Sequence, residues 1–123
     1  MRFVVVLAAL ALLAGCGEDA QPMAPRLADL TVTVDHGSKT KRAAVRCAAA
    51  EDSDVCRAVA ALKAEAFEPT PGHVACTEIY GGPETATITG TLRGEPIDAR
   101  FSRENGCEIA RWLTARPLLD AAG

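Results

Sequence analysis

The spacing of four cysteines constrains the fold of this 123-residue chain more than any other feature; they are Cys47, Cys56, Cys76 and Cys107. In a small exported protein, an even number of cysteines predicts a disulfide framework, here with three possible connectivities. Pairing Cys47 with Cys56 and Cys76 with Cys107 keeps each bridge within one structural unit, and we expect this pattern. In the chain-entropy model the two closed loops contribute about 2.5 and 3.5 kcal/mol to stability. This contribution matters because the chain has only three Phe, one Trp and one Tyr with which to fill a core.

The N-terminus predicts export and a membrane anchor. Met1-Arg2 gives a short positive end, and residues 3–12 form an apolar run that is too short to span a bilayer. Leu13 to Cys16 resemble the bacterial lipobox, in which the cysteine thiol is lipidated and the cysteine becomes the first residue of the mature chain. We therefore expect residues 1–15 to be a lipoprotein signal peptide and the lipid on Cys16 to hold the protein on a membrane. The alternative is an ordinary secretory signal, and either signal places the mature chain outside the cytoplasm.

Length and charge leave room for one small domain and exclude several function classes. Residues 16–26 have no apolar period and predict a flexible tether, while residues 27–123 make up the expected domain. A net charge of −3, with no basic cluster beyond the run from Lys39 to Arg42, argues against a nucleic-acid partner. The sequence shows no Ser/His/Asp set, no paired acids and no repeated metal-ligand spacing. We therefore expect neither an enzyme nor a bound cofactor or metal.

Alternating apolar residues predict two strand pairs, over 30–34 with 43–47 and over 85–92 with 97–101. Arg93-Gly94 provides the turn of the second pair. Pro96 cannot donate a ladder hydrogen bond, so its strand is expected at a sheet edge or beside a bulge. One face of the second hairpin is rich in threonine and could pair across a two-fold axis in a homodimer or simply face water; it comprises Thr85, Thr87, Thr89 and Thr91.

Two helices are expected. A Ser53 cap followed by apolar residues at helical spacing predicts an amphipathic helix from about Ser53 to Ala66, with Cys56 in its first turn. Apolar residues over 109–113 predict a short closing helix that is ended by Pro117.

The segment between the first helix and the second hairpin predicts an exposed, braced loop. Prolines and glycines in residues 68–72 precede it and Gly81-Gly82-Pro83 follow it, which leaves no room for a helix or a long strand. Cys76 lies two residues before the peptide bond between Glu78 and Ile79. A disulfide there would brace a backbone segment that a protease can reach, and such a loop indicates an inhibitor.

The order of several short motifs is more specific than any one of them. An early Leu-Thr-Val strand is followed by His36-Gly37, a first disulfide leads into an alanine-rich helix, and further on lie Cys76-x-x-x-Tyr80 with a following proline, Gly90-Thr91-Leu92-Arg93-Gly94, Phe101-Ser102 and Asn105-Gly106-Cys107-Glu108. This set resembles the Streptomyces subtilisin inhibitor family over nearly the whole of residues 27–113. The resemblance implies an α+β fold with a five-stranded antiparallel sheet, two helices packed on one face and two disulfides, usually assembled as a dimer. It also implies inhibition of serine proteases by a substrate-like mechanism.

The resemblance also implies a reactive bond. In the family the residue two after the loop cysteine is P1, which makes Glu78 P1 and Glu78–Ile79 the scissile bond of a reactive loop formed by Cys76, Thr77, Glu78, Ile79 and Tyr80. The disulfide at Cys76 would keep the leaving amine close, so that religation competes with hydrolysis. Asn105 is expected either to support the loop by hydrogen bonding or to be a turn residue beside Gly106.

The chain departs from the family pattern in ways that bear on its target. Glu78 stands where methionine, lysine or arginine is more usual, and a trypsin-like pocket would bury it against a second carboxylate. The expected partner is therefore an extracellular subtilisin-like protease or a glutamyl endopeptidase. Gly81-Gly82 lengthen the segment after the bond and predict weaker preorganisation, and the short apolar strand that the family has after Cys107 is lacking.

A second function stays open beside inhibition. The chain could be a non-inhibitory lipoprotein that retains the inhibitor fold as a protein-interaction module. A thiol-disulfide redox role is disfavoured because no Cys-x-x-Cys motif is present.

Overall fold

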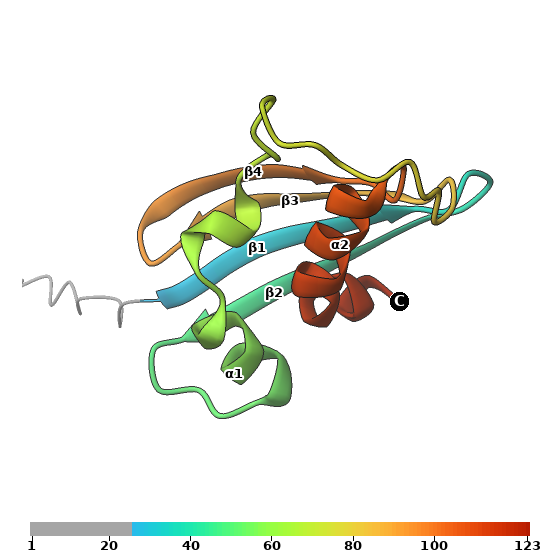
Figure 1. The fold of residues 1–123 in the computed structure, drawn as a ribbon. Coiled ribbons are helices and arrows are strands. Elements are labelled where there is room, and N and C mark those ends of the chain that lie inside the picture. Colours follow the sequence, from blue (N-terminus) through green and yellow to red (C-terminus); the bar gives the residue numbers. More distant parts are fainter. Residues whose placement is uncertain (1–25) are drawn as a thin grey trace, which may run out of the picture.

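A computed structural model of the protein describes residues 26–123, which form an α+β domain (Figure 1). The predicted signal peptide, Cys16 and the tether residues before Arg26 lie outside the described residues. Arg26, expected to be the last tether residue, is the first residue of strand β1. Along the described part of the chain, no helix is long and apolar enough to cross a membrane.

Four antiparallel strands form one sheet in the order β2-β1-β3-β4, with bounds β1 Arg26–Asp35, β2 Thr40–Ala48, β3 Thr85–Leu92 and β4 Glu95–Phe101. Both predicted strand pairs are present, and a further pairing joins β1 to β3. In this pairing Ala28 lies opposite Leu92 and Asp35 lies opposite Thr85. Pro96 lies in β4, which is an edge strand, as the missing N–H of proline predicts.

Helix α1 (Asp54–Ala61) begins where the sequence predicts. The side-chain oxygen of Ser53 accepts a hydrogen bond from the backbone N–H of Cys56 at 3.3 Å, and Asp54 places a negative charge at the positive end of the helix. The disulfide between Cys47 and Cys56 ties this first turn to the end of β2. Ser53 and the bridge together fix where the helix starts.

The predicted continuation of this helix to Ala66 is wrong. Leu62 has an extended backbone, and a 3₁₀ turn, η1, follows at Ala64–Phe67. Arg93, in the turn between β3 and β4, donates hydrogen bonds to the carbonyls of Ala60 and Leu62 at 2.6 and 3.2 Å. Because a distant arginine donates hydrogen bonds to carbonyls at the helix end, ending the helix there costs little free energy in unpaired carbonyl groups.

Helix α2 (Gly106–Leu119) is longer than predicted, because the chain stays helical through Pro117. A proline at this position removes the N–H that would bond to the carbonyl of Leu113 and crowds that carbonyl, which costs stability. Leu118 and Leu119 are both buried, so continuing the helix beyond the proline places two leucines in the core.

The five-stranded sheet is not found, since residues 26–123 form a sheet of four strands. Residues 68–84, rich in proline and glycine, contain no strand, and residues 106–119 are helical. Both stretches therefore lack the extended, ladder-forming backbone that a fifth strand needs.

One face of the sheet carries the core, and both helices lie over it (Figure 1). The buried strand residues include Leu30, Val32, Val34, Val45, Ile88 and Phe101, and the helical layer adds Val59, Phe67 and Leu118. The threonines of β3 occupy the opposite face, where Thr85, Thr89 and Thr91 are exposed. The two predicted disulfides, Cys47–Cys56 and Cys76–Cys107, are both confirmed.

Candidate functional site

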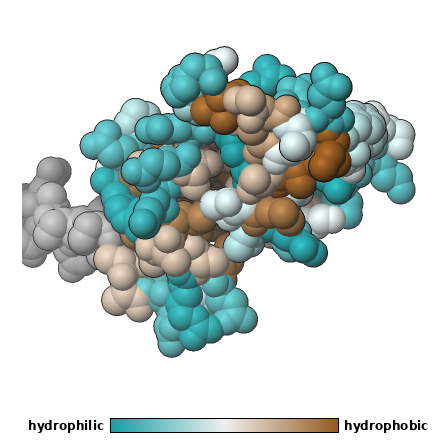
Figure 2. Space-filling view, in the orientation of Figure 1, coloured by the Kyte–Doolittle hydropathy of each residue, from teal (hydrophilic) through white to brown (hydrophobic). Residues whose placement is uncertain are grey.

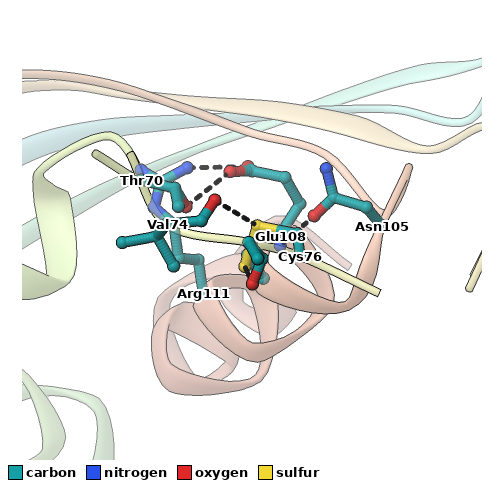
Figure 3. Close-up of a disulfide and its surroundings, with 8 residues drawn as sticks. Thr70, Val74, Cys76, Asn105, Glu108 and Arg111 are labelled. Atoms are coloured by element: carbon teal, nitrogen blue, oxygen red, sulfur yellow. Dashed lines mark hydrogen bonds and ion pairs between the residues drawn. A yellow bond between two sulfur atoms is a disulfide. The ribbon is translucent and has the colours of Figure 1, made fainter. Parts of the chain in front are cut away.

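The predicted loop lies in the long connection from η1 to β3, which is anchored on helix α2 before it reaches the loop. The hydroxyl of Thr70 donates a hydrogen bond to the Glu108 carboxylate at 3.0 Å. Glu108 also forms a 2.8 Å ion pair with Arg111, and these side chains are only 15% and 14% exposed. Arg111 in turn donates to the carbonyl of Arg100 at the end of β4. Figure 3 shows the contacts of Glu108 with Thr70 and Arg111 beside the disulfide.

The disulfide fixes the start of the loop to the first turn of α2. Cys76 is bonded to Cys107, and the backbone N–H of Gly106 donates to the carbonyl of Thr77 at 2.9 Å. The approach is so close that a β-carbon on Gly106 would lie 2.0 Å from the Thr77 hydroxyl oxygen. Glycine at this position therefore allows the loop to lie directly on the helix end.

Asn105 serves this arrangement as the N-cap of α2. Its side-chain oxygen accepts a hydrogen bond from the backbone N–H of Glu108 at 3.0 Å. The loop itself is held by the backbone of the next residue, Gly106. Asn105 thus orders the helix turn that carries both Gly106 and Cys107, and any support that it gives the loop is indirect.

The far end of the loop is held at Gly81. Its backbone N–H donates to the carbonyl of Arg103 at 2.7 Å, and a β-carbon there would lie 3.0 Å from the Ile109 side chain. Gly82 has a φ of +139°, which L side chains rarely adopt. The glycine pair that predicts weaker preorganisation therefore also permits a close, hydrogen-bonded contact with the rest of the domain.

An ion pair lies at the same end of the loop as Gly81. Arg103 contacts the carboxylate of Glu84 at 3.1 Å, and its guanidinium lies 5.9 Å from the centre of the Trp112 ring. The pKa of Glu84 is lowered, first by a hydrogen bond from its own backbone N–H and then by the charge and hydrogen bond of Arg103, against an opposing effect of desolvation. The carboxylate is thus held in its ionised form at the exit from the loop.

Between these anchors, three successive side chains face solvent. Glu78, Ile79 and Tyr80 are exposed, with Ile79 62% and Tyr80 66% accessible. Val74 and Leu113 complete the large apolar side chains that are exposed in the described part of the molecule. Figure 2 shows apolar surface on the loop and along α2, bordered by hydrophilic residues. The loop therefore presents the Glu78–Ile79 bond on a restrained, accessible backbone.

Sequence reasoning places Cys76 to Tyr80 in an exposed loop but misses the residues that hold its far end. Arg103, Glu84 and Trp112 were not predicted to act together. The two glycines before Pro83 are a local signal for an unusual backbone, but they do not identify a partner about twenty positions later in the chain.

Residues 26–123 contain no group of three or more His, Cys, Asp or Glu side chains arranged to hold a metal ion. His36 and His73, the histidines of the chain, lie in exposed turn regions. The loop itself offers exposed carboxylate, aliphatic and aromatic side chains in succession, at Glu78, Ile79 and Tyr80.

Comparison with known proteins returned no matching family model, no similar curated protein and no similar solved structure.

Proposed function

We propose that the protein is a substrate-like inhibitor of serine proteases, with Glu78–Ile79 as its reactive bond, and that a lipid on Cys16 holds it on the outside of a membrane. The observation that supports inhibition is the loop geometry. Exposed residues 78–80 lie between a hydrogen bond at Thr77 and another at Gly81, with a disulfide directly before them.

A restrained loop favours binding because a chain already held in one conformation loses little entropy when it docks. Here the restraint acts on both sides of the proposed bond, through Gly106 and Arg103. A protease can thus bind residues 78–80 as it would a substrate, while the rest of the domain keeps the backbone from moving away.

The side chain of Glu78 selects among proteases. It is exposed and carries a carboxylate to the pocket that receives P1. A pocket with its own carboxylate would repel Glu78, whereas one with basic groups would pair with it, and a wide, hydrated groove would tolerate it. The proposed targets are therefore glutamyl endopeptidases and, with lower affinity, subtilisin-like enzymes.

The test is a titration of the protein against subtilisin, trypsin and a glutamyl endopeptidase, followed by mass analysis of any fragments. We expect tight inhibition of the glutamyl enzyme, weaker inhibition of subtilisin, and slow cleavage confined to Glu78–Ile79. Rapid digestion at several bonds, or no binding to any of the three enzymes, would refute inhibition and favour the non-inhibitory interaction module.

A further inference from the structure

Arg103 contacts the segment after the proposed bond in more than one way. Its carbonyl accepts the hydrogen bond from Gly81, and its guanidinium pairs with Glu84 and lies over Trp112. The ion-paired side chains of Arg103 and Glu84 are only 33% and 27% exposed. The pair is thus partly shielded from water, which strengthens it relative to a fully exposed pair.

The disulfide cannot hold the amine side of a cut loop, because Cys76 lies on the carbonyl side of the proposed bond. If Glu78–Ile79 is cut, Cys76 still ties the fragment ending at Glu78 to α2. The fragment beginning at Ile79 is next fixed in the sheet at Thr85, the first residue of β3. Without another anchor, residues 79–84 would be a free end. The hydrogen bond at Gly81 shortens that free end to Ile79 and Tyr80.

We propose that Arg103, supported by Glu84 and Trp112, is a positioning residue that keeps the Ile79 amine beside the Glu78 carbonyl after cleavage, so that the bond is resealed. This inference rests on the proposed inhibitory function. It assigns the amine side of the loop its own anchor, in place of the disulfide alone.

The chemical step is reversible acyl transfer. The protease serine oxygen adds to the Glu78 carbonyl carbon, the bond to the Ile79 nitrogen breaks, and the serine proton passes through the protease base to the leaving amine. In resealing, the Ile79 amine attacks the acyl carbon, the serine oxygen leaves, and the proton returns to it. In hydrolysis, water takes the place of the amine and yields the α-carboxylate of Glu78. This step is also reversible, because the protease serine can add to the α-carboxyl of a cut chain and re-form the acyl-enzyme with loss of water. Holding the amine close favours resealing because it raises the amine's effective concentration.

The first test measures resealing with the full chain. Purified protein cut at Glu78–Ile79 is incubated with a catalytic amount of the protease that cuts there, and recovery of intact chain is followed by mass spectrometry. We expect Glu84→Gln to slow resealing by about two- to fivefold, the size expected for losing one partly exposed ion pair. Glu104→Gln changes an exposed glutamate next to Arg103 and is the matched control, with resealing as in the wild type.

A charge swap separates positioning from general stability. The double variant Glu84→Arg with Arg103→Glu restores an ion pair of reversed direction but loses the contact of the guanidinium with Trp112, and it should recover part of the lost resealing rate. Equal resealing by the wild type and Glu84→Gln would overturn the inference. So would a swap that resealed no faster than Glu84→Gln although it melted at the wild-type temperature.

A second measurement does not depend on inhibition. In the cut chain, hydrogen exchange of the Gly81 amide should be slow in the wild type and in Glu104→Gln, and faster in Glu84→Gln. If the wild type inhibits no protease, the proposed function fails, and the exchange rates still decide whether Arg103 and Glu84 hold this segment. Equally fast exchange in wild type and Glu84→Gln would refute the anchor.

Discussion

At the residue scale, Glu78 is the residue that would select the target protease under the proposed function. Its side chain is exposed in the middle of the restrained segment, so its charge enters any pocket that binds P1. Replacing Glu78 with lysine removes a like-charge contact with a trypsin-like pocket and creates an opposite-charge one.

We expect Glu78→Lys to tighten trypsin inhibition by about a hundredfold or more and to weaken inhibition of a glutamyl endopeptidase. Inhibition constants for both enzymes are the measurement. Glu104→Lys makes the same change of net charge at an exposed position off the loop and should alter neither constant appreciably. If Glu78→Lys gains nothing against trypsin, the geometry of the loop is not competent for inhibition.

Gly106 is the second residue on which the loop depends. A β-carbon there would lie 2.0 Å from the Thr77 hydroxyl oxygen, so we expect Gly106→Ala to destabilise the domain by about 1–3 kcal/mol through overpacking. Urea unfolding measures the loss. Gly72→Ala is the matched control, since no atom lies within 4 Å of its β-carbon position. Thr77→Ala in the Gly106→Ala background should recover part of the loss; an unchanged midpoint for Gly106→Ala would contradict the close approach.

At the element scale, sequence reasoning succeeds where the determinants are local. The β3–β4 hairpin follows from alternation and from Arg93-Gly94, whose φ values of 49° and 79° suit a tight hairpin turn. The start of α1 follows from Ser53. The end of α1 could not be predicted, because its last carbonyls are satisfied by Arg93, more than thirty positions later.

The distinction between local determinants and contacts from distant residues also applies to the candidate site. The exposed loop and its disulfide could be inferred from cysteine spacing and from flanking prolines and glycines. The anchor at Gly81 could not, because it needs the carbonyl of Arg103 to be brought alongside by the return of β4. The fifth strand was implied by resemblance alone, and helix α2 occupies the corresponding end of the chain.

The two disulfides serve different elements, so their removal should separate stability from loop integrity. We expect Cys47→Ala with Cys56→Ala to cost about 2.5 kcal/mol, and Cys76→Ala with Cys107→Ala about 3.5 kcal/mol, by the loop-entropy model. In addition, only the second pair of changes should convert the loop into a rapidly cleaved substrate. Urea unfolding and the rate of cleavage at Glu78–Ile79 measure the two effects; equal cleavage rates in the two variants would contradict this division.

The Glu84–Arg103 ion pair predicts that the stability of the domain depends on pH in the acid range. Because the folded-state pKa of Glu84 lies below the ordinary value of a glutamate carboxyl, the carboxylate stabilises the fold at pH values above that ordinary value, and this contribution is lost as the pH falls through the folded-state pKa. The stability difference between wild type and Glu84→Gln should therefore be largest near neutral pH and shrink in acid. His36, Arg116 and Asp120 line one pocket with Glu84 and Arg103, and they are present in both proteins. A difference that grew in acid would contradict the assignment.

At the scale of the whole molecule, the proposed lipid anchor on Cys16 can be tested separately from the loop. Cys16 lies outside the described residues, so its lipidation stays a prediction from the lipobox resemblance. We expect the wild type to fractionate with membranes and to carry the mass of a lipidated N-terminal cysteine, and Cys16→Ala to lose the lipid. Fractionation with mass spectrometry is the measurement. A wild-type chain recovered only in the soluble fraction would refute the anchor while leaving the inhibitor proposal intact.

The positions of the two chain ends relative to β1 determine where a resin or a fusion partner can be attached without covering the loop. Arg26 begins the strand, whereas the loop rejoins the sheet at Thr85, opposite Asp35 at the other end of β1. A ten-residue strand is about 30 Å long. The C-terminus lies at the loop end, since the carbonyl of Gly123 accepts a hydrogen bond from Lys41, beside the end of β1. A resin or fusion partner joined ahead of Arg26 would leave residues 78–80 accessible to a protease. One joined after Gly123 would lie at the same end of the domain as the loop and hinder access to it.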